Sequence, residues 1–293
     1  MTKNHEIYQI LLRYACEKLT VRDNKYLPLI EVVKKLGIHK KLQSGEIKCL
    51  IIGGGSCQYE IPLIQAITNN AEITSLDSVE PAKFSTLNLR WVEGSAPEGL
   101  LLLPEEMFDV IICLGTTRYF TDTQLTLKSI CKKARTESII IFDIMKLSPI
   151  KTEATKVLRD YLLNSVDYVE ALSKLEQLSK FFCKLSRSLN SQYALNDIAI
   201  PELGIESGAP FQQVIYDALC PIYFNENDKS EELEVMTLWQ ILCTGTLPLD
   251  FDISNIARDC NFTIASEIRL NANTTAFISA KSDTDRENPF LNF

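Results

Sequence analysis

Three consecutive glycines, Gly53, Gly54 and Gly55, follow an apolar run in the segment IKCLIIGGGSCQYEIP, residues 47–62. The apolar run is typical of a buried strand, and the residues after the glycines can open a helix. A strand that ends in glycines and turns into a helix brings backbone N–H groups close to a ligand, because glycine has no side chain in the way. The segment predicts a ligand-binding turn; the alternative is a tight turn that binds nothing.

Two kinds of ligand fit such a turn. A dinucleotide fingerprint, G-x-G-x-x-G, would use Gly53 and Gly55 but would place Gln58 at its third glycine position. The other ligand is S-adenosylmethionine (SAM), whose amino-acid part a G-x-G loop can cradle. Both need a carboxylate after the second strand to accept hydrogen bonds from ribose hydroxyls. Glu80, in DSVEPA, directly follows the predicted strand 73–79 and suits that role.

The elements around the turn alternate between strand and helix. The runs DVIICLG and SIIIFDI are apolar throughout, as expected of parallel strands covered on both faces. The alternation predicts a doubly wound, Rossmann-like α/β fold. The predicted strands are 48–52, 73–79, 88–92, 110–114 and 138–142, with helices between them, for instance at 61–67 and 123–133.

Segments on either side extend this core, 46–149. Residues 1–45 are predicted to form a helical lead-in, and 150–245 a long helical insertion. Residues 246–283 read as a helix and two strands, 263–270 and 274–281. A short connection makes these two strands antiparallel, so the last strand of a seven-stranded sheet is antiparallel. Residues 284–293 are a predicted tail.

The end of the chain decides between the two ligands. A helix, a strand and a short antiparallel return strand close the sheet of class I SAM-dependent methyltransferases, whereas a nicotinamide-binding domain does not normally end in this way. The chain resembles this family over 47–147 and 250–281. The motifs that carry the resemblance are, in order, CLIIGGGS, SVEPA, LRWVEGSAPE, FDVIICLGTTRYFTD and ESIIIFDIM. It implies SAM as the cofactor and methyl transfer as the activity.

The resemblance also implies roles for the residues of the loop. Gly53, Gly54 and Gly55 would let the backbone approach the methionine carboxylate and the sulfonium, and Glu80 would bind the ribose. Two positions depart from the family pattern. Ile51 stands where the family has an acidic residue, and Cys57 stands where it has a third loop glycine.

Further positions follow from the same resemblance. Ser95 and Ala96 would lie beside the adenine, and Leu114 and Gly115 would pack near the adenine and the reactive methyl group. The closing NANTTAFISA is similar to the last strand of histamine N-methyltransferases, in which an asparagine contacts the substrate. Asn273 would match that asparagine, which makes a small amine one candidate substrate.

Methyl transfer from a sulfonium is a direct displacement, so the protein mainly aligns the nucleophile and excludes water. The substrate would lie over the carboxyl ends of the fourth and fifth strands. We predict Tyr119 and Asp143 as catalytic candidates and Thr116 as a substrate contact. The alternatives are that Tyr119 packs a helix and that Asp143 serves as a turn or cap residue. The polar residues that the sequence supplies there are Thr116, Thr117, Arg118, Tyr119, Asp143 and Lys146.

The insertion 150–245 is predicted to form a lid over the substrate. It is rich in aromatic side chains, which suits an apolar small-molecule pocket, and we take Tyr216 as a substrate contact. Each aromatic could instead pack the insertion onto the core. These aromatics are Tyr161, Tyr168, Phe181, Phe182, Tyr193, Phe211, Tyr216 and Tyr223.

Composition restricts the partners. A net charge of −8 and a pI near 5.0 argue against a broad nucleic-acid surface, and the basic run 34–41 reads as a solvated helix end. Two histidines, both ahead of the glycines, argue against a His-rich metal site or a serine–histidine relay. We predict no metal.

The nine cysteines include no C-x-x-C pair and predict buried free thiols in a reducing compartment. No segment has the layout of a signal peptide or of a membrane span, so we expect a cytoplasmic protein without a membrane partner.

The sequence thus predicts a SAM-dependent methyltransferase that acts on oxygen or nitrogen of a small molecule. Two alternatives stay open. A SAM-binding fold can serve as a cyclase or transfer an aminopropyl group, and a chain with the altered loop can serve as an inactive partner subunit. The apolar N-terminal helices could form a homodimer surface in any of these cases.

Overall fold

The computed structural model describes residues 7, 10–11, 26–38, 42, 45–55, 57, 59–78, 80, 89–117, 120, 122–145, 160–177, 253–270 and 274–281. The chain divides into two compact units. One comprises Val21–Lys146 and Gly245–Phe293, and the other comprises Met1–Thr20 and Leu147–Thr244. The first contains every strand that the structure describes, and we call it the sheet unit. In the other unit, 160–163 and 168–177 are helical.

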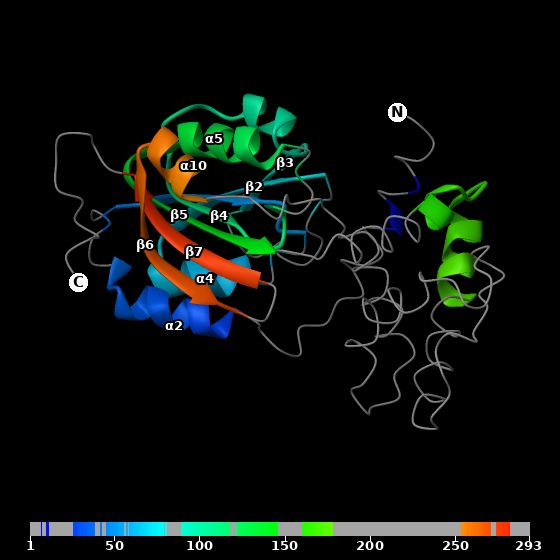
Figure 1. The fold of residues 1–293 in the computed structure, drawn as a ribbon, viewed down its shortest axis with the longest axis horizontal. Coiled ribbons are helices and arrows are strands. Elements are labelled where there is room, and N and C mark those ends of the chain that lie inside the picture. Colours follow the sequence, from blue (N-terminus) through cyan, green and yellow to red (C-terminus); the bar gives the residue numbers. More distant parts are fainter. Residues whose placement is uncertain are drawn as a thin grey trace, which may run out of the picture. The chain divides into compact units, whose positions relative to one another are not determined.

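A seven-stranded mixed sheet forms the centre of the sheet unit (Figure 1). Its strands lie in the order β3-β2-β1-β4-β5-β7-β6. The first five strands pair in parallel, and β7 is antiparallel to both of its neighbours, as predicted for the last strand. The bounds are β1 (Ile47–Ile52), β2 (Ala71–Asp77), β3 (Leu89–Glu93), β4 (Phe108–Cys113), β5 (Ala134–Met145), β6 (Phe262–Arg269) and β7 (Thr274–Lys281).

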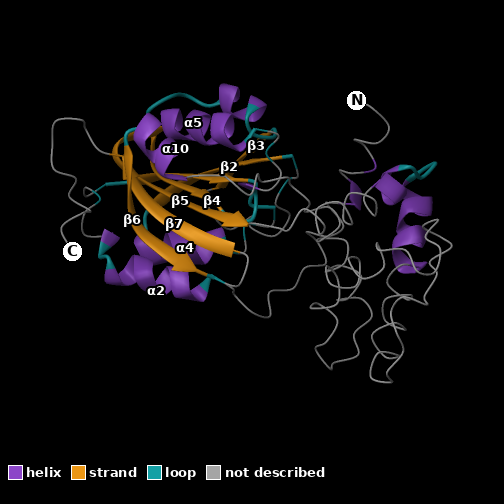
Figure 2. Ribbon diagram, viewed as in Figure 1, coloured by secondary structure: helices purple, strands orange, loops and turns teal. Residues whose placement is uncertain are grey.

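Helices cover both faces of the sheet (Figure 2). On one face lie α2 (Leu27–Lys35) and α4 (Glu60–Ile67); on the other lie α5 (Thr123–Lys133) and α10 (Ile253–Asp259). A short 3-10 helix, η1 (Glu98–Leu102), follows β3. Because α2 belongs to the sheet unit, the division of the chain falls inside the predicted lead-in 1–45.

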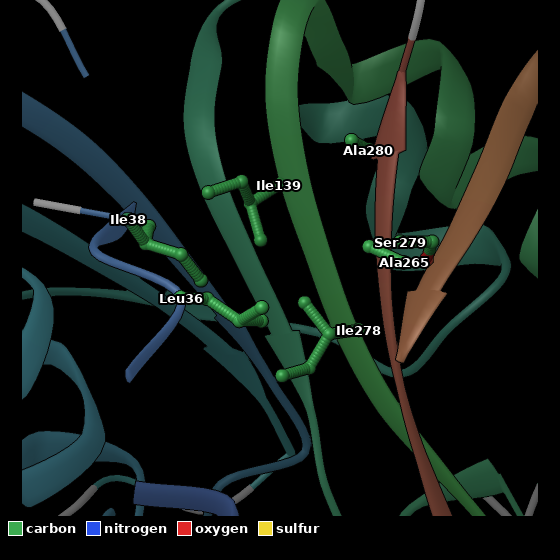
Figure 3. Close-up of a pocket in the computed structure, with 7 residues that line it drawn as sticks. All are labelled: Leu36, Ile38, Ile139, Ala265, Ile278, Ser279 and Ala280. Atoms are coloured by element: carbon green, nitrogen blue, oxygen red, sulfur yellow. The ribbon is translucent and has the colours of Figure 1, made fainter. Parts of the chain in front are cut away.

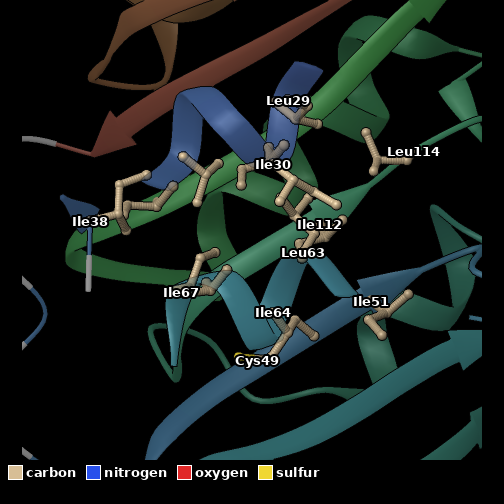
Figure 4. Packing of buried hydrophobic residues seen from close by; sticks show 14 of the residues in the cluster. Leu29, Ile30, Ile38, Cys49, Ile51, Leu63, Ile64, Ile67, Ile112 and Leu114 are labelled. Carbon is tan, nitrogen blue, oxygen red and sulfur yellow. The ribbon is translucent and has the colours of Figure 1, made fainter. Parts of the chain in front are cut away.

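Each face has its own hydrophobic core, since successive strand residues point to opposite faces. In β1, Cys49 and Ile51 pack with α2 and α4, whereas Leu50 and Ile52 pack towards α5 and α10. Figure 4 shows the first of these cores, in which Leu29 and Ile30 of α2 lie close to Leu63 of α4 on one face of the sheet. The continuous apolar runs of the sequence therefore correspond to strands buried on both faces, as predicted.

Of the seven described strands only β7 has its predicted bounds, and the largest changes for the argument are at the end of β2 and the start of β5. β2 ends at Asp77 rather than Val79, so Ser78 and Val79, which we had expected inside the strand, follow it in the sequence. β5 begins at Ala134 rather than 138. Three of the residues added at its start, 135–137, are polar and exposed. The register between β4 and β5 shifts there, with Phe108 opposite Ala134 and Val110 opposite Ile139. The helix 123–133 and the strand 274–281 have the predicted bounds.

Asp122 caps helix α5. Its carboxylate accepts a hydrogen bond from the N–H of Leu125 at 2.8 Å, which satisfies one of the donors that every helix leaves open at its start. We expect Asp122→Ala to lower the free energy of unfolding by about 1 kcal/mol, as measured by urea denaturation. The matched control is Ser129→Ala in the middle of the same helix, where an exposed hydroxyl only bonds back to Leu125. Equal losses in the two variants would contradict the capping role.

Candidate functional site

The glycine turn lies at the carboxyl end of β1. Gly53 and Gly55 have φ angles of +63° and +53°, in the left-handed region that favours glycine. A side chain at Gly53 would overlap Thr116, and one at Gly54 would lie 2.9 Å from the sulfur of Cys57. The backbone therefore passes here at a distance that only glycine permits. Such a turn can come close to a ligand.

The turn is anchored to β2 on one side. The N–H of Gly53 donates to the carbonyl of Leu76 at 2.9 Å, and the N–H of Gly55 donates to the carboxylate of Asp77 at 2.7 Å. Asp77 is the last residue of β2 and is 7% exposed. It was not among the predicted site residues. Glu80, predicted to follow the strand directly, lies three residues beyond Asp77 and is exposed.

The carboxyl end of β3 lies next to that of β2. The indole N–H of Trp91 and the backbone N–H of Gly94 both donate to the carbonyl of Asp77, at 3.0 and 3.1 Å. The predicted adenine neighbours come next in the chain: Ser95 is exposed, and Ala96 is half-buried against the α5-side core. Asp77 therefore bonds both to the end of β3 and to the glycine turn, and Ser95 and Ala96 follow the end of β3.

On the other side the turn is anchored to the segment that follows β4. The hydroxyl of Thr116 lies 2.9 Å from the carbonyl oxygen of Gly53, and 3.2 Å from those of Ile52 and Leu114. Thr116 is 7% exposed, and its hydroxyl can donate only one hydrogen at a time. It therefore ties the ends of β1 and β4 together, and this is a different task from the substrate contact that the sequence predicts for it.

Asp143 fixes the other end of the same segment. One of its carboxylate oxygens accepts from the N–H of Gly115 at 2.6 Å, and the other accepts from the hydroxyl of Tyr26 at 2.8 Å. Its carbonyl accepts from the hydroxyl of Thr117 at 2.7 Å. The side chain is 2% exposed. Asp143 thus links β5, the end of β4 and the residue that precedes α2.

Buried carboxylates lie beneath the glycine turn, near the carboxyl ends of β4 and β5. Glu60, the first residue of α4, is 2% exposed, as is Asp143. Burial raises the pKa of the Cys113 thiol at the end of β4, and the charges of Asp143 and Glu60 raise it further, so both carboxylates lie near this sulfur. With Asp77 beside the turn, the arrangement favours a ligand that carries positive charge.

The structure brings most of the predicted site residues to one edge of the sheet. Gly53, Gly54, Gly55, Leu114, Gly115, Thr116 and Asp143 belong to one hydrogen-bonded framework at the ends of β1, β4 and β5. The order of the strands reverses between β1 and β4, and ligands of doubly wound sheets bind at such a switch point. Tyr119, Asn273 and Tyr216 lie outside the described residues, as do Arg118 and Lys146.

An apolar hollow elsewhere in the sheet unit does not belong to this site. It measures about 220 Å³ including open solvent, and no charged side chain lines it (Figure 3). Its lining residues are Leu36, Ile38, Ile139, Ala265, Ile278, Ser279 and Ala280.

Within the described ranges, no group of three His, Cys, Asp or Glu residues could hold a metal ion. None of the described helices has the length and apolar character needed to cross a membrane.

Comparisons with solved structures find matches among methyltransferases. A SAM-dependent methyltransferase from Aquifex aeolicus matches with a TM-score of 0.41 and 12% identity, over 88% of this chain and 94% of that one. A Burkholderia thailandensis 1,6-didemethyltoxoflavin-N1-methyltransferase, solved with S-adenosylhomocysteine, matches with a TM-score of 0.45 and 12% identity, over 97% and 92%. An O-methyltransferase family protein from the same organism matches with a TM-score of 0.45 and 10% identity, over 89% and 57%.

No protein-family model matches the sequence, and the comparison with curated proteins gives no match. The structural matches have low scores and low identities, so we assign the fold from the sheet itself. Its strand order, the antiparallel β7 and the helices on both faces are those of a Rossmann-like, class I methyltransferase fold.

Proposed function

We propose that this chain binds SAM at the carboxyl edge of β1, β2 and β4 and transfers its methyl group to oxygen or nitrogen of a small molecule. The observation that carries the proposal is the framework at the switch point. There, the glycine turn is held between Asp77 and Thr116, at distances that exclude any side chain at Gly53. A turn shaped in this way suits a ligand that approaches the backbone closely.

The charges at this edge support the choice of cofactor. Bound SAM would supply an electrophilic methyl group on a cationic sulfonium. The buried carboxylates of Asp77, Asp143 and Glu60 favour a positively charged ligand over one with several phosphates. A pyrophosphate-containing dinucleotide would bring negative charge to the same place.

The residues of the site divide into two tasks. Asp77 and Thr116 already bond to the turn and position it, and Asp143 positions Gly115. Glu80 is exposed, and the resemblance places the ribose hydroxyls there. Glu80 is thus our candidate for direct cofactor contact. The acceptor is a small molecule in this proposal because the acidic chain disfavours nucleic acid and because the insertion 150–245 is large enough to enclose a pocket.

Calorimetric titration with SAM and S-adenosylhomocysteine tests the cofactor site. We expect binding to the purified chain, and we expect Glu80→Ala to weaken it roughly 10- to 100-fold, since a carboxylate that accepts from two hydroxyls is lost. The free energy of unfolding should not change. The matched control is Glu105→Ala, an exposed carboxylate in the turn before β4, at the opposite edge of the sheet.

Asp77→Ala distinguishes a residue that positions the glycine turn from one that contacts the cofactor directly. It leaves the N–H of Gly55 without its acceptor, so it should weaken SAM binding and also lower the free energy of unfolding by about 1–3 kcal/mol.

No binding by the unaltered chain would overturn the enzymatic proposal in favour of a partner subunit. If SAM binds, incubation with small amines and phenols gives the reaction type. S-adenosylhomocysteine as the product indicates methyl transfer rather than aminopropyl transfer or cyclisation.

A further inference from the structure

Two polar side chains lie close together where β5 ends and β7 begins. Asp143 is near the end of β5, and Thr274 is the first residue of β7. Because the two strands pair antiparallel, Met145, the last residue of β5, lies opposite Thr274, and Asp143 lies opposite the next residue but one of β7. Asp143 and Thr274 are therefore diagonal neighbours, with Cα atoms about 7–8 Å apart. Both stand at the carboxyl edge of the sheet, beside the segment that follows β4.

The two side chains also point to the same face of the sheet, since successive residues of a strand alternate between the faces. Ala276, two residues after Thr274, packs in the core on the α2–α4 side. Ile141, two residues before Asp143, packs in the same core. The hydrogen bond from the Tyr26 hydroxyl places Asp143 on this side independently, because Tyr26 directly precedes α2. A ligand over the ends of β5 and β7 on this side would therefore meet both polar groups.

The hydroxyl of Thr274 is buried without a hydrogen bond. The residue is 1% exposed, and no group in the described part of the chain donates to its side-chain oxygen or accepts from it. Its backbone carbonyl, by contrast, accepts from the N–H of Leu270 at 2.9 Å. Buried hydroxyls in folded proteins are nearly always bonded, because an unbonded one has lost its bonds to water and gained none in return. A ligand group that donates or accepts a hydrogen bond would satisfy it.

The carboxylate of Asp143 is hydrogen-bonded but is not paired with a cation. Its two oxygens accept from the N–H of Gly115 and from the hydroxyl of Tyr26, and both of these donors are neutral. None of the lysines, arginines and histidines that the structure describes forms an ion pair with it. Buried charges in proteins are usually paired, and each carboxylate oxygen can accept a further hydrogen bond. Asp143 thus favours a ligand group that is cationic and donates hydrogen bonds.

We propose that the methyl acceptor is a small primary amine whose protonated amino group binds between Thr274 and Asp143. The inference rests on the proposed methyl transfer and names the class of its substrate. An ammonium group has three N–H donors, so it can donate to the Thr274 hydroxyl and to an Asp143 oxygen at once. Contact with so buried a hydroxyl encloses the cation, and the charge of Asp143 offsets its loss of water. The ammonium is an anchor rather than the nucleophile, because a protonated nitrogen has no lone pair. Methyl transfer therefore takes place at another oxygen or nitrogen of the same molecule.

Matched pairs of ligands test the ammonium anchor. The probes are tyramine with 4-ethylphenol and tryptamine with 3-ethylindole, and the members of each pair differ only by the amino group. Calorimetric titration into the full chain, with and without S-adenosylhomocysteine, measures their affinities. We expect each amine to bind roughly 10- to 100-fold more tightly than its deaminated counterpart, because hydrogen bonds to a charged group are lost with the amino group.

Thr274→Val removes the hydroxyl and keeps nearly the same volume. It should weaken the binding of both amines roughly tenfold and change that of the deaminated ligands by less than about twofold. The urea midpoint and the affinity for S-adenosylhomocysteine should not fall, because the hydroxyl bonds to no described group. Ser138→Ala is the matched control. Its hydroxyl is likewise buried and unbonded among the described residues, but it lies in the first half of β5, away from the carboxyl edge, so all four affinities should stay unchanged.

Three results would overturn the anchor. They are amines that bind no more tightly than their deaminated counterparts, a loss in Thr274→Val that is equal for both members of a pair, and an equal loss in Ser138→Ala. The two proposals fail separately. A chain that binds S-adenosylhomocysteine but not the amines keeps the proposed methyl transfer and loses the anchor. A chain that binds the amines through Thr274 but does not bind S-adenosylhomocysteine keeps the anchor and loses the methyl transfer.

Discussion

Gly53→Ala is expected to lower the free energy of unfolding by about 1–3 kcal/mol and to remove measurable SAM binding. Two physical reasons act together. The residue has a φ of +63°, where an alanine side chain is strained, and an ideal Cβ would lie 2.9 Å from the Cβ of Thr116 and overlap the rest of that side chain. Relief requires the turn and the segment after β4 to separate, and this is the framework on which the proposed site is built.

Gly45→Ala is the matched control. Gly45 precedes the same strand, nothing lies within 4 Å of its ideal Cβ, and its φ is not in the left-handed region. We expect it to leave both unfolding and binding within error of the unaltered chain. Urea denaturation and calorimetric titration measure the two effects separately. If Gly53→Ala behaves like Gly45→Ala in denaturation, the close approach to Thr116 is not present in solution.

The sequence predicts best the strands and helices whose buried positions follow a regular pattern of apolar residues. β1 and β4 are apolar at nearly every position, because both of their faces are covered, and α5 has an acidic cap at its start and lysines at its end. Such patterns are local, so they can be recognised without knowing the neighbours. Residues 135–137 of β5 are exposed and polar, and they lie where the register between β4 and β5 shifts, which no local pattern in the sequence indicates.

The candidate site could be predicted in its location but not in its connections. Strand ends and glycines indicate the carboxyl edge, and Asp143 was expected there. Its partner Tyr26 is 117 residues away, in a segment whose sequence indicates only a helical lead-in. No local pattern joins the two. Asp77 was within reach of the sequence, since placing the end of β2 two residues earlier would have made it the strand-end carboxylate.

Asp143→Ala is expected to be among the most destabilising single substitutions in the sheet unit, at about 3–5 kcal/mol. It removes the acceptor of the Gly115 N–H and of the Tyr26 hydroxyl, and both donors lie near or within the protein interior. Tyr26→Phe removes only one of these hydrogen bonds, together with its donor, and should cost about 1 kcal/mol. Urea denaturation of the single variants and of the double variant measures both.

The double variant Tyr26→Phe/Asp143→Ala should cost less than the sum of the two, because phenylalanine leaves no hydroxyl to be unsatisfied when the carboxylate is absent. Additive losses would show that Tyr26 and Asp143 do not interact in solution.

The same variants distinguish a positioning role for Asp143 from a reacting one. A carboxylate that only removes a proton from the acceptor would leave SAM binding unchanged when it is replaced by Ala. Asp143 instead holds the N–H of Gly115, so Asp143→Ala should weaken SAM binding, and Tyr26→Phe should weaken it in the same direction to a smaller extent. Asp143→Asn keeps an amide oxygen that can accept from the Gly115 N–H, so it should weaken binding less than Asp143→Ala. Tyr26 reaches the site only through Asp143 in this account. An effect of Tyr26→Phe on binding in the Asp143→Ala background would therefore contradict it.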